Sequence, residues 1–140
     1  MLSEVFGEVW GEIDYLGVFV GAIAYFALGG LWYAPAVFGK RWGELAGVNP
    51  QQGNQATALA IGFVAGFVAA LAIGFLAVLT GVADALDGAL LGLVIGVAFG
   101  LFQAISSVTF EQKSSELIWI NGGYGLVGAV ITGLVIGVFA

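Results

Sequence analysis

Long runs of apolar residues alternate with short polar segments along this chain. Four runs stand out, over about residues 14–34, 56–80, 85–109 and 117–140. Each is near or above the roughly 20 residues that an α-helix needs to cross a bilayer. The runs are continuous, whereas the strands of a membrane β-barrel alternate apolar and polar positions. The pattern therefore predicts an all-α membrane protein, a bundle of four transmembrane helices that forms one domain over residues 1–140.

Turn and cap residues separate these runs. Pro35 ends or kinks the first span, because proline lacks a backbone N–H. The segment 49–54, Asn-Pro-Gln-Gln-Gly-Asn, is typical of a turn. Residues 81–84 form a tight connection in which Asp84 is expected to cap the third span. Residues 111–115 make the last connection.

Two short amphipathic segments accompany the spans. Near the N-terminus, apolar residues recur at helical spacing and Glu4, Glu8 and Glu12 fall on the other face. This segment is either an interfacial helix that presents an acidic stripe to a partner or to cations, or the solvated outer end of the first span's helix, and we favour the second interpretation. Residues 36–47 are expected to form a short interfacial helix, with Trp42 at the membrane surface.

Composition agrees with a membrane environment and narrows the chemistry. Hydrophobic residues make up 61% of the chain and charged residues 9%, against about 25% charged residues in soluble domains. The sequence has no cysteine and no histidine, which removes thiolate chemistry, zinc–thiolate sites and histidine-ligated haem. Paired carboxylates inside the spans are also lacking. We therefore expect no enzymatic activity and no cofactor.

Charge bears on partners and on orientation. A net charge of -6 argues against nucleic acid, which needs a basic surface. The three cations are Lys40, Arg41 and Lys113, and four antiparallel spans place both of their loops on one side. By the positive-inside rule that side is cytoplasmic. We expect a multi-pass protein of the plasma membrane with loops 35–55 and 110–116 inside the cell and both termini outside.

Glycine is spaced in a way that indicates close helix packing. The chain has 24 glycines, and many recur every four residues along one helix face. The predicted packing positions are Gly17 and Gly21 in the first span, Gly62 and Gly66 in the second, Gly88, Gly92, Gly96 and Gly100 in the third, and Gly133 and Gly137 in the fourth. Small residues let helix backbones approach closely in lipid. Contact within one chain, contact between copies, or a flat isoprenoid lipid or pigment in a glycine groove would all use such faces.

Polar residues within the spans are costly and therefore informative. They gather near the ends of the first and third spans and near the start of the fourth. The members of this candidate polar pocket are Trp32, Tyr33, Gln103, Ser106, Ser107, Asn121 and Tyr124. With the orientation above, all of them lie in the inner half of the membrane. They are either a binding site for a polar headgroup, a small solute or an ion, or interhelical hydrogen bonds that hold the bundle together, and we favour the second interpretation.

Two stretches of the chain resemble a known family. Residues 29–42, Gly-Gly-Leu-Trp-Tyr-Ala-Pro-Ala-Val-Phe-Gly-Lys-Arg-Trp, resemble the signature of the domain of unknown function 1761 family. Phe110-Glu111 with Lys113, followed by Ile120-Asn121-Gly122-Gly123-Tyr124, is similar to that family's second conserved region. Family members often carry a histidine where this chain has Gly125. The resemblance implies a small four-span membrane protein of prokaryotic type and implies no activity.

Two functions remain as hypotheses. The first is a structural or accessory membrane protein, which forms a homo-oligomer or is a lipid- or isoprenoid-pigment-binding subunit of a larger membrane complex. It rests on the glycine pattern, on the lack of catalytic groups and on the small soluble mass. The second is a small-solute or ion transporter or channel that uses the inner-half polar pocket. Such a transporter needs a continuous polar path, and the outer halves of the spans offer almost none.

Overall fold

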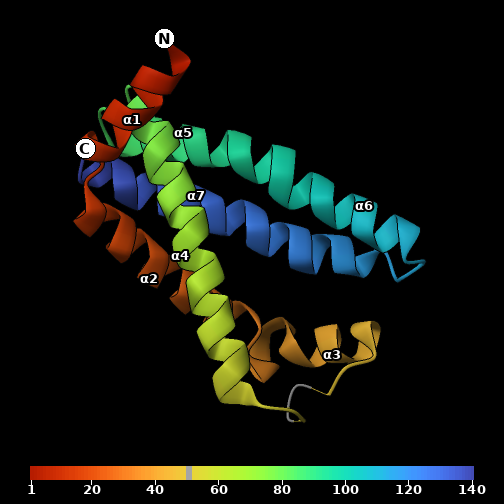
Figure 1. Cartoon of the computed structure of the whole chain (residues 1–140). Coiled ribbons are helices and arrows are strands. Elements are labelled where there is room, and N and C mark those ends of the chain that lie inside the picture. Colours follow the sequence, from red (N-terminus) through yellow and green to blue (C-terminus); the bar gives the residue numbers. More distant parts are fainter. Residues whose placement is uncertain (50–51) are drawn as a thin grey trace.

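The computed structural model describes residues 1–49 and 52–140, and their regular elements are all helices (Figure 1). Four of these helices are long and apolar enough to cross a membrane: Tyr15–Trp32, Gln55–Thr80, Ala85–Phe110 and Ile118–Val138. Their bounds agree with the apolar runs of the sequence to within a few residues. The prediction of an all-α, four-span membrane protein is confirmed. Two residues of the expected turn over 49–54, Pro50 and Gln51, lie outside the described part of the chain.

The first two spans are regular α-helices, α2 (Tyr15–Trp32) and α4 (Gln55–Thr80). The third consists of α5 (Ala85–Ile95), a π-helical segment η2 (Gly96–Leu101) and α6 (Phe102–Phe110). The fourth begins with a second π-helical segment, η3 (Ile118–Gly122), and continues as α7 (Gly123–Val138). Asp84 caps α5 as predicted, because its side chain accepts a hydrogen bond from the Asp87 N–H at 2.9 Å.

The N-terminal segment is a separate helix, α1 (Leu2–Glu12), so the interpretation that it continues the first span is wrong. The chain turns to an extended conformation at Ile13, with ψ 130°. Asp14 then starts α2 by accepting a hydrogen bond from the Gly17 N–H at 3.0 Å. Trp10 of α1 packs on Phe75 of α4, with ring centroids 5.1 Å apart. The Asp14 cap starts α2 as a new helix, and the Trp10–Phe75 contact holds α1 against α4. Helix α1 is therefore a separate element from the span.

The segment after the first span also forms the expected short helix. Ala34 is extended, as the residue before a proline tends to be, and the π-helical turn η1 (Pro35–Gly39) follows it. Helix α3 (Lys40–Ala46) continues from η1 and ends at Gly47, whose φ of 69° is left-handed. Proline thus ends α2 and starts a new helix that runs in another direction (Figure 1).

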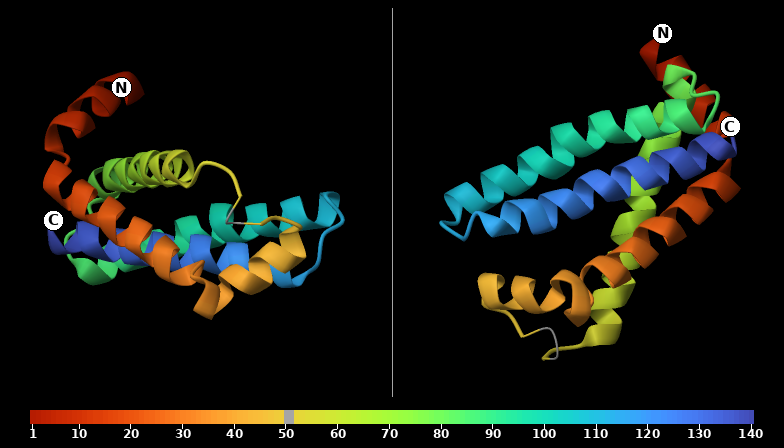
Figure 2. Two further views of the ribbon diagram at one scale, coloured as in Figure 1. Left: turned by 90° about the horizontal axis from the view of Figure 1, so that it is seen from below. Right: turned by 180° about the vertical axis from the view of Figure 1, so that it is seen from behind.

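Helix α7 is the centre of the molecule. It pairs along its length with the third span and also packs against α2 and α4 (Figure 2). The side chain of Thr132, in the middle of α7, is fully buried, and so is Ala22 of α2. The main apolar cluster joins residues of α2, α4 and α7, among them Val18, Ile73 and Ile136. The first, second and fourth spans therefore share one small core.

Glycines bring the third and fourth spans into backbone contact. A Cβ added at Gly92 would collide with the carbonyl of Ala129, and one added at Gly88 would collide with the carbonyl of Gly133. An added Cβ would lie 2.9 Å from the Leu126 Cα at Gly96, and 3.0 Å from the Gly125 carbonyl carbon at Gly100. From the other side, Gly133 and Gly137 face the backbone of Gly88 and Asp84. No side chain separates the two helices here.

The glycines of the first two spans behave differently from one another. Gly17 lies under the ring of Phe139, and Gly21 lies under Thr132, where an added Cβ would be 3.3 Å from the threonine methyl group. At Gly62 and Gly66, by contrast, an added Cβ would meet nothing within 4 Å. The reason is that α4 crosses the α5–α7 pair instead of running along it (Figure 1). Gly62 is exposed and has no close neighbour in the described chain, whereas Gly66 is buried although its Cβ position is open.

Gly92→Ala is expected to destabilise the protein strongly, because the new methyl group must separate α5 from the backbone of α7. Overpacking of this kind costs about 1–3 kcal/mol. Thermal unfolding in mild detergent, followed by circular dichroism, measures the effect. Gly62→Ala is the matched control, since the space around Gly62 is open, and it should not lower the midpoint. Equal stability of the two variants would contradict the backbone contact.

Candidate functional site

The end of α2 is joined to the start of the fourth span by side-chain hydrogen bonds. The indole Nε1 of Trp32 donates to the carbonyl of Ile120 at 2.8 Å. The hydroxyl of Tyr33 donates to the Asn121 Oδ1 at 2.7 Å. Both acceptors belong to η3, and π-helical turns of this kind occur frequently at functional sites. We call Trp32, Tyr33, Asn121 and Tyr124 the inner cluster.

Aromatic rings extend the inner cluster along α2 and α3. The ring of Tyr124 lies 5.3 Å from that of Tyr33 and 5.1 Å from that of Tyr25, both edge to face. Trp42 of α3 packs against Tyr33 at 5.7 Å. The Tyr124 hydroxyl also approaches the backbone carbonyl of Tyr25, at 3.5 Å. Edge-to-face packing fixes the rings relative to one another, so the inner cluster is a rigid connection between the first span, α3 and the fourth span.

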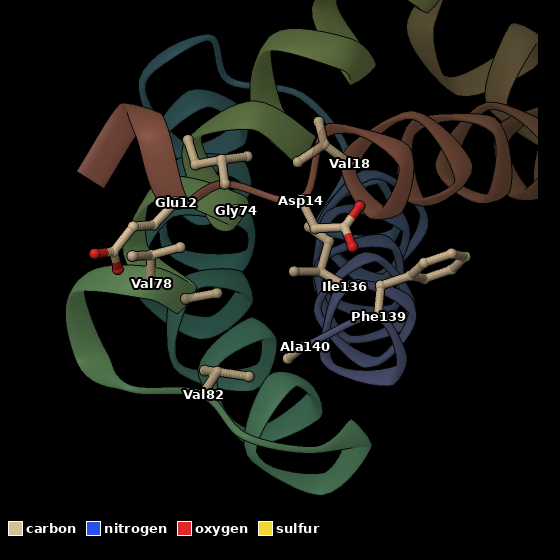
Figure 3. Close-up of a pocket in the computed structure, with 11 residues that line it drawn as sticks. Glu12, Asp14, Val18, Gly74, Val78, Val82, Ile136, Phe139 and Ala140 are labelled. Carbon is tan, nitrogen blue, oxygen red and sulfur yellow. The ribbon is translucent and has the colours of Figure 1, made fainter. Parts of the chain in front are cut away.

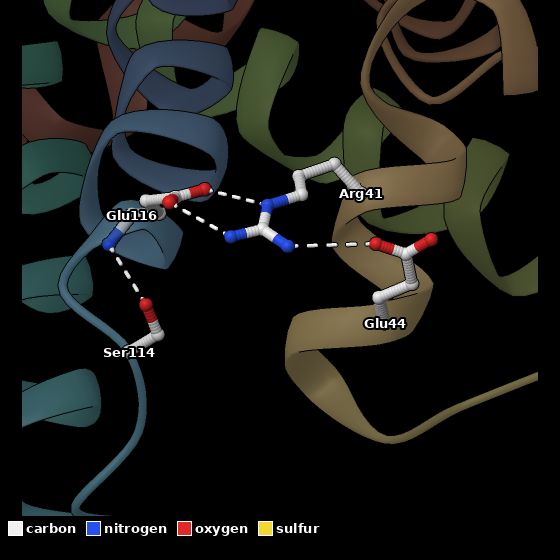
Figure 4. Close-up of polar contacts among 4 residues, drawn as sticks. All are labelled: Arg41, Glu44, Ser114 and Glu116. Carbon is white, nitrogen blue, oxygen red and sulfur yellow. Dashed lines mark hydrogen bonds and ion pairs between the residues drawn. The ribbon is translucent and has the colours of Figure 1, made fainter.

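An ion pair closes the same region at its surface (Figure 4). The guanidinium of Arg41, on α3, donates from Nε and Nη2 to the two carboxylate oxygens of Glu116, each at 2.8 Å. It also reaches Glu44 at 3.4 Å. The hydrogen bond from Arg41 lowers the pKa of Glu116 below its ordinary value of 4.5. Arg41 and Glu116 are about half exposed, which limits how much the pair stabilises the fold.

The polar residues of the third span do not join the inner cluster. Gln103 is exposed, and Ser106 is half-buried. The Ser107 hydroxyl donates to Glu111 on its own helix at 3.1 Å. Within the described residues, none of the three forms a hydrogen bond with the inner cluster. The glycine contact sets the rotation of the third span, and this rotation turns Gln103 away from α2. The predicted pocket between three spans is therefore a contact between two of them.

The hydrogen-bonding groups of the inner cluster are largely used on one another. Trp32 Nε1, Tyr33 OH and Asn121 Oδ1 each have a protein partner. Such contacts between transmembrane helices are worth about 0.6 kcal/mol each on average. In the described part of the chain, no group of three or more Asp, Glu, His or Cys side chains is placed to hold a metal ion. The hydrogen bonds of the inner cluster therefore fit a structural role, joining the first and fourth spans, better than a catalytic one.

Sequence analysis allowed for a glycine groove but did not locate the lateral groove that the structure shows between α4 and η2. Its volume is about 450 Å³. It is lined by Tyr25 of α2, by Ala69, Ala72, Ile73 and Leu76 of α4, by Ile95, Gly96, Phe99 and Gly100 of the third span, and by Gly125 and Ala129 of α7. Ala72 and Phe99 are exposed, so the groove opens sideways. All its lining residues belong to helices that are long and apolar enough to cross a membrane. The only hints in the sequence were the small residues of the second and third spans.

A second cavity, of about 390 Å³, lies at the end of the molecule that holds both termini (Figure 3). Ile136 and Phe139 line it on one side and Val78 and Val82 on another. The carboxylates of Glu12 and Asp14 are beside it (Figure 3), and Asp14 is already used to cap α2. This cavity brings together none of the predicted site residues.

Comparison with known proteins identifies the family to which the sequence belongs. The sequence model of the family described as "Protein of unknown function (DUF1761)" matches residues 16–137. This match confirms the resemblance seen in residues 29–42 and 110–124. No curated protein and no solved structure matches the chain.

The hydrogen bond between Tyr33 and Asn121 is expected to couple the two residues energetically. In a double-mutant cycle with Tyr33→Phe and Asn121→Leu, the coupling should be about 0.6 kcal/mol, the average for such contacts in membranes. Reversible unfolding in mixed micelles measures the four stabilities. Additive effects, with no coupling beyond error, would show that the bond contributes nothing to the contact between the first and fourth spans.

The ion pair between Arg41 and Glu116 is expected to make stability depend on pH in acid. The pKa of Glu116 is lowered in the folded protein, so the stabilisation is present above the unfolded pKa and is lost as the pH falls through the folded pKa. Wild type should therefore exceed Glu116→Gln slightly in thermal midpoint at pH 7. The difference should shrink to nothing in acid. A difference that stays constant with pH would mean that the pair does not stabilise the fold.

Proposed function

We propose that this protein, which belongs to the DUF1761 family, is an accessory membrane protein that binds an apolar lipid or isoprenoid chain in the groove between α4 and η2. The observation that carries the proposal is the groove itself, which lies among the membrane-spanning helices. Its volume of about 450 Å³ falls in the range of roughly 300–1,000 Å³ that is usual for ligand pockets. A hydrocarbon chain is the natural occupant of an apolar groove that opens to lipid.

The shape of the groove follows from small residues on its floor. Gly125 and Ala129 of α7 and Gly100 of η2 line it, where the backbones of the third and fourth spans lie against each other. Ile73 and Leu76 of α4 supply branched apolar walls. Dispersion contacts with such a surface favour an elongated apolar chain that lies against the helices. A groove of this form suits an isoprenoid or acyl chain that lies along the helices.

Transport of a polar solute has less support. The inner cluster uses Trp32, Tyr33 and Asn121 in hydrogen bonds within the protein. The backbone contact between α5 and α7 brings the third and fourth spans together without intervening side chains. Both features favour a static, closed bundle over one that opens a polar path. We therefore rank lipid binding above transport.

The exposed first part of α4 supports a place in a homo-oligomer or a larger membrane complex. Every residue from Gln55 to Gly62 is exposed, and a Cβ added at Gly62 would meet nothing within 4 Å. Small residues without a neighbour in the same chain allow close approach of another helix in the bilayer. We propose that a second copy or another membrane protein covers this part of the helix.

We further propose a plasma-membrane location with the loops 35–55 and 110–116 in the cytoplasm and both termini outside. The ion pair between Arg41 and Glu116 joins the first of these loops to the beginning of the fourth span. Both termini lie together at the opposite end of the molecule (Figure 1). The cationic residues Lys40, Arg41 and Lys113 thus gather at one end, which supports the positive-inside assignment.

Filling the groove is expected to remove the bound lipid. Ala72 is exposed on the groove wall, so Ala72→Phe places a ring where the chain would lie. Native mass spectrometry of protein purified in mild detergent should show a lipid adduct on wild type and at least a several-fold smaller adduct on the variant. Ala27→Phe, at an exposed position of α2 outside the groove, is the matched control and should retain the lipid. No adduct on wild type, or equal adducts on both variants, would refute the proposal.

A further inference from the structure

Among the described residues that line the groove, Tyr25 alone has a side chain that can form a hydrogen bond. The other lining residues are glycine, alanine, isoleucine, leucine and phenylalanine. No charged side chain lines the groove, and the cations Lys40, Arg41 and Lys113 are all outside the spans. An ionised ligand group would therefore be without a counter-charge in hydrocarbon, which is costly. The groove suits a neutral ligand.

The hydroxyl of Tyr25 differs from its neighbours in having no partner. Tyr33 donates to Asn121, and Tyr124 approaches the Tyr25 carbonyl. Among the residues that the structure describes, no hydrogen bond involves the hydroxyl of Tyr25. Inside a bilayer no water is at hand to replace a missing partner, and an unpaired hydroxyl there is unfavourable. This hydroxyl is therefore available for a ligand.

The ring that carries the hydroxyl is held in place. It packs edge to face on Tyr124, with centroids 5.1 Å apart and planes at 87°. Its Cζ atom lies over Gly128 of α7, 2.9 Å from the position of an added Cβ. Any side chain at residue 128 would displace the ring. A fixed donor loses little freedom when it binds, which is the basis of preorganised recognition.

The depth of Tyr25 in the membrane limits which kinds of ligand oxygen can reach its hydroxyl. At about 1.5 Å of rise per residue, Tyr25 lies roughly 15 Å along the helix from Tyr15 and 10 Å from Trp32, the two ends of the span. It is therefore well inside a hydrocarbon layer of about 30 Å. The ester carbonyls of a phospholipid lie at the edge of that layer and do not reach it. The partner oxygen must belong to a group that is itself buried in hydrocarbon.

We infer that the groove takes a neutral isoprenoid-type lipid with a carbonyl or hydroxyl oxygen on a ring or chain end, and that this oxygen accepts a hydrogen bond from Tyr25. The inference rests on the proposed lipid-binding function and specifies its ligand class. The apolar walls hold the chain, and Tyr25 sets the position of the oxygenated end. Because Tyr25 is the single side-chain donor among the groove residues that the structure describes, the protein should bind oxygenated chains more tightly than plain hydrocarbon chains.

Two probes of similar size test the inference. Phylloquinone has ring carbonyls on an isoprenoid chain, and squalane is an isoprenoid hydrocarbon without oxygen. Binding to the delipidated full-length protein is measured by native mass spectrometry in one detergent. Wild type should bind phylloquinone about tenfold more tightly than squalane, the effect of one well-placed hydrogen bond. Tyr25→Phe should lose that preference and keep its affinity for squalane. Tyr15→Phe removes a hydroxyl outside the groove, and as the matched control it should retain the preference.

The outcomes separate this inference from the proposed function. If wild type and Tyr25→Phe bind both probes equally and Ala72→Phe binds neither, the groove binds chains but Tyr25 does not select them, and the inference is overturned alone. If wild type binds neither probe, the proposed function fails and the inference fails with it. Retention of the preference in Tyr25→Phe would also overturn the inference, because the oxygen would then be recognised elsewhere.

Discussion

Contact between the backbones of the third and fourth spans is the constraint on which the rest of the structure depends. Helices in lipid gain little by hiding apolar side chains from one another, so association requires close approach and dispersion contacts. Gly88 and Gly92 provide this approach against the carbonyls of Gly133 and Ala129. Once the two helices are joined in this register, α7 has only its remaining faces left for α2 and α4. The core of the molecule is therefore small and centred on α7.

The position of α4 follows from the same constraint. Its second half packs on the core through Ala70, Ile73 and Gly74, which are buried, while its first residues, Gln55 to Gly62, are exposed. Because α4 crosses the α5–α7 pair (Figure 2), it leaves a groove beside η2 that no side chain of the described chain fills. The π-helical turn places Gly96, Phe99 and Gly100 along that groove. Close packing in one half of the bundle thus produces an opening in the other, and the proposed ligand occupies that opening.

Much of the fold could be predicted from the sequence, but the groove could not. Hydropathy located the four spans, and turn chemistry located their ends, because both depend on local composition. The common depth of Tyr33 and Asn121 in the predicted spans placed them in one polar cluster, but the hydrogen bond between them was not predicted. Depth alone did not reveal that Gln103 is exposed, because the position of a polar residue along a helix does not specify which neighbouring helix its side chain faces. The spacing of Gly62 and Gly66 matched that of Gly88 and Gly92, yet only the second pair faces the backbone of another helix, because spacing does not specify which helices cross and which align.

The most direct test is a crystal structure of the protein grown from a lipidic mesophase, which retains bilayer lipid around the spans. The account predicts α5 in backbone contact with α7 at Gly92, α4 turned away from η2, and elongated density in the groove that reaches the hydroxyl of Tyr25. A structure in which side chains separate α5 from α7, or in which α4 lies flush on η2 and closes the groove, would contradict it.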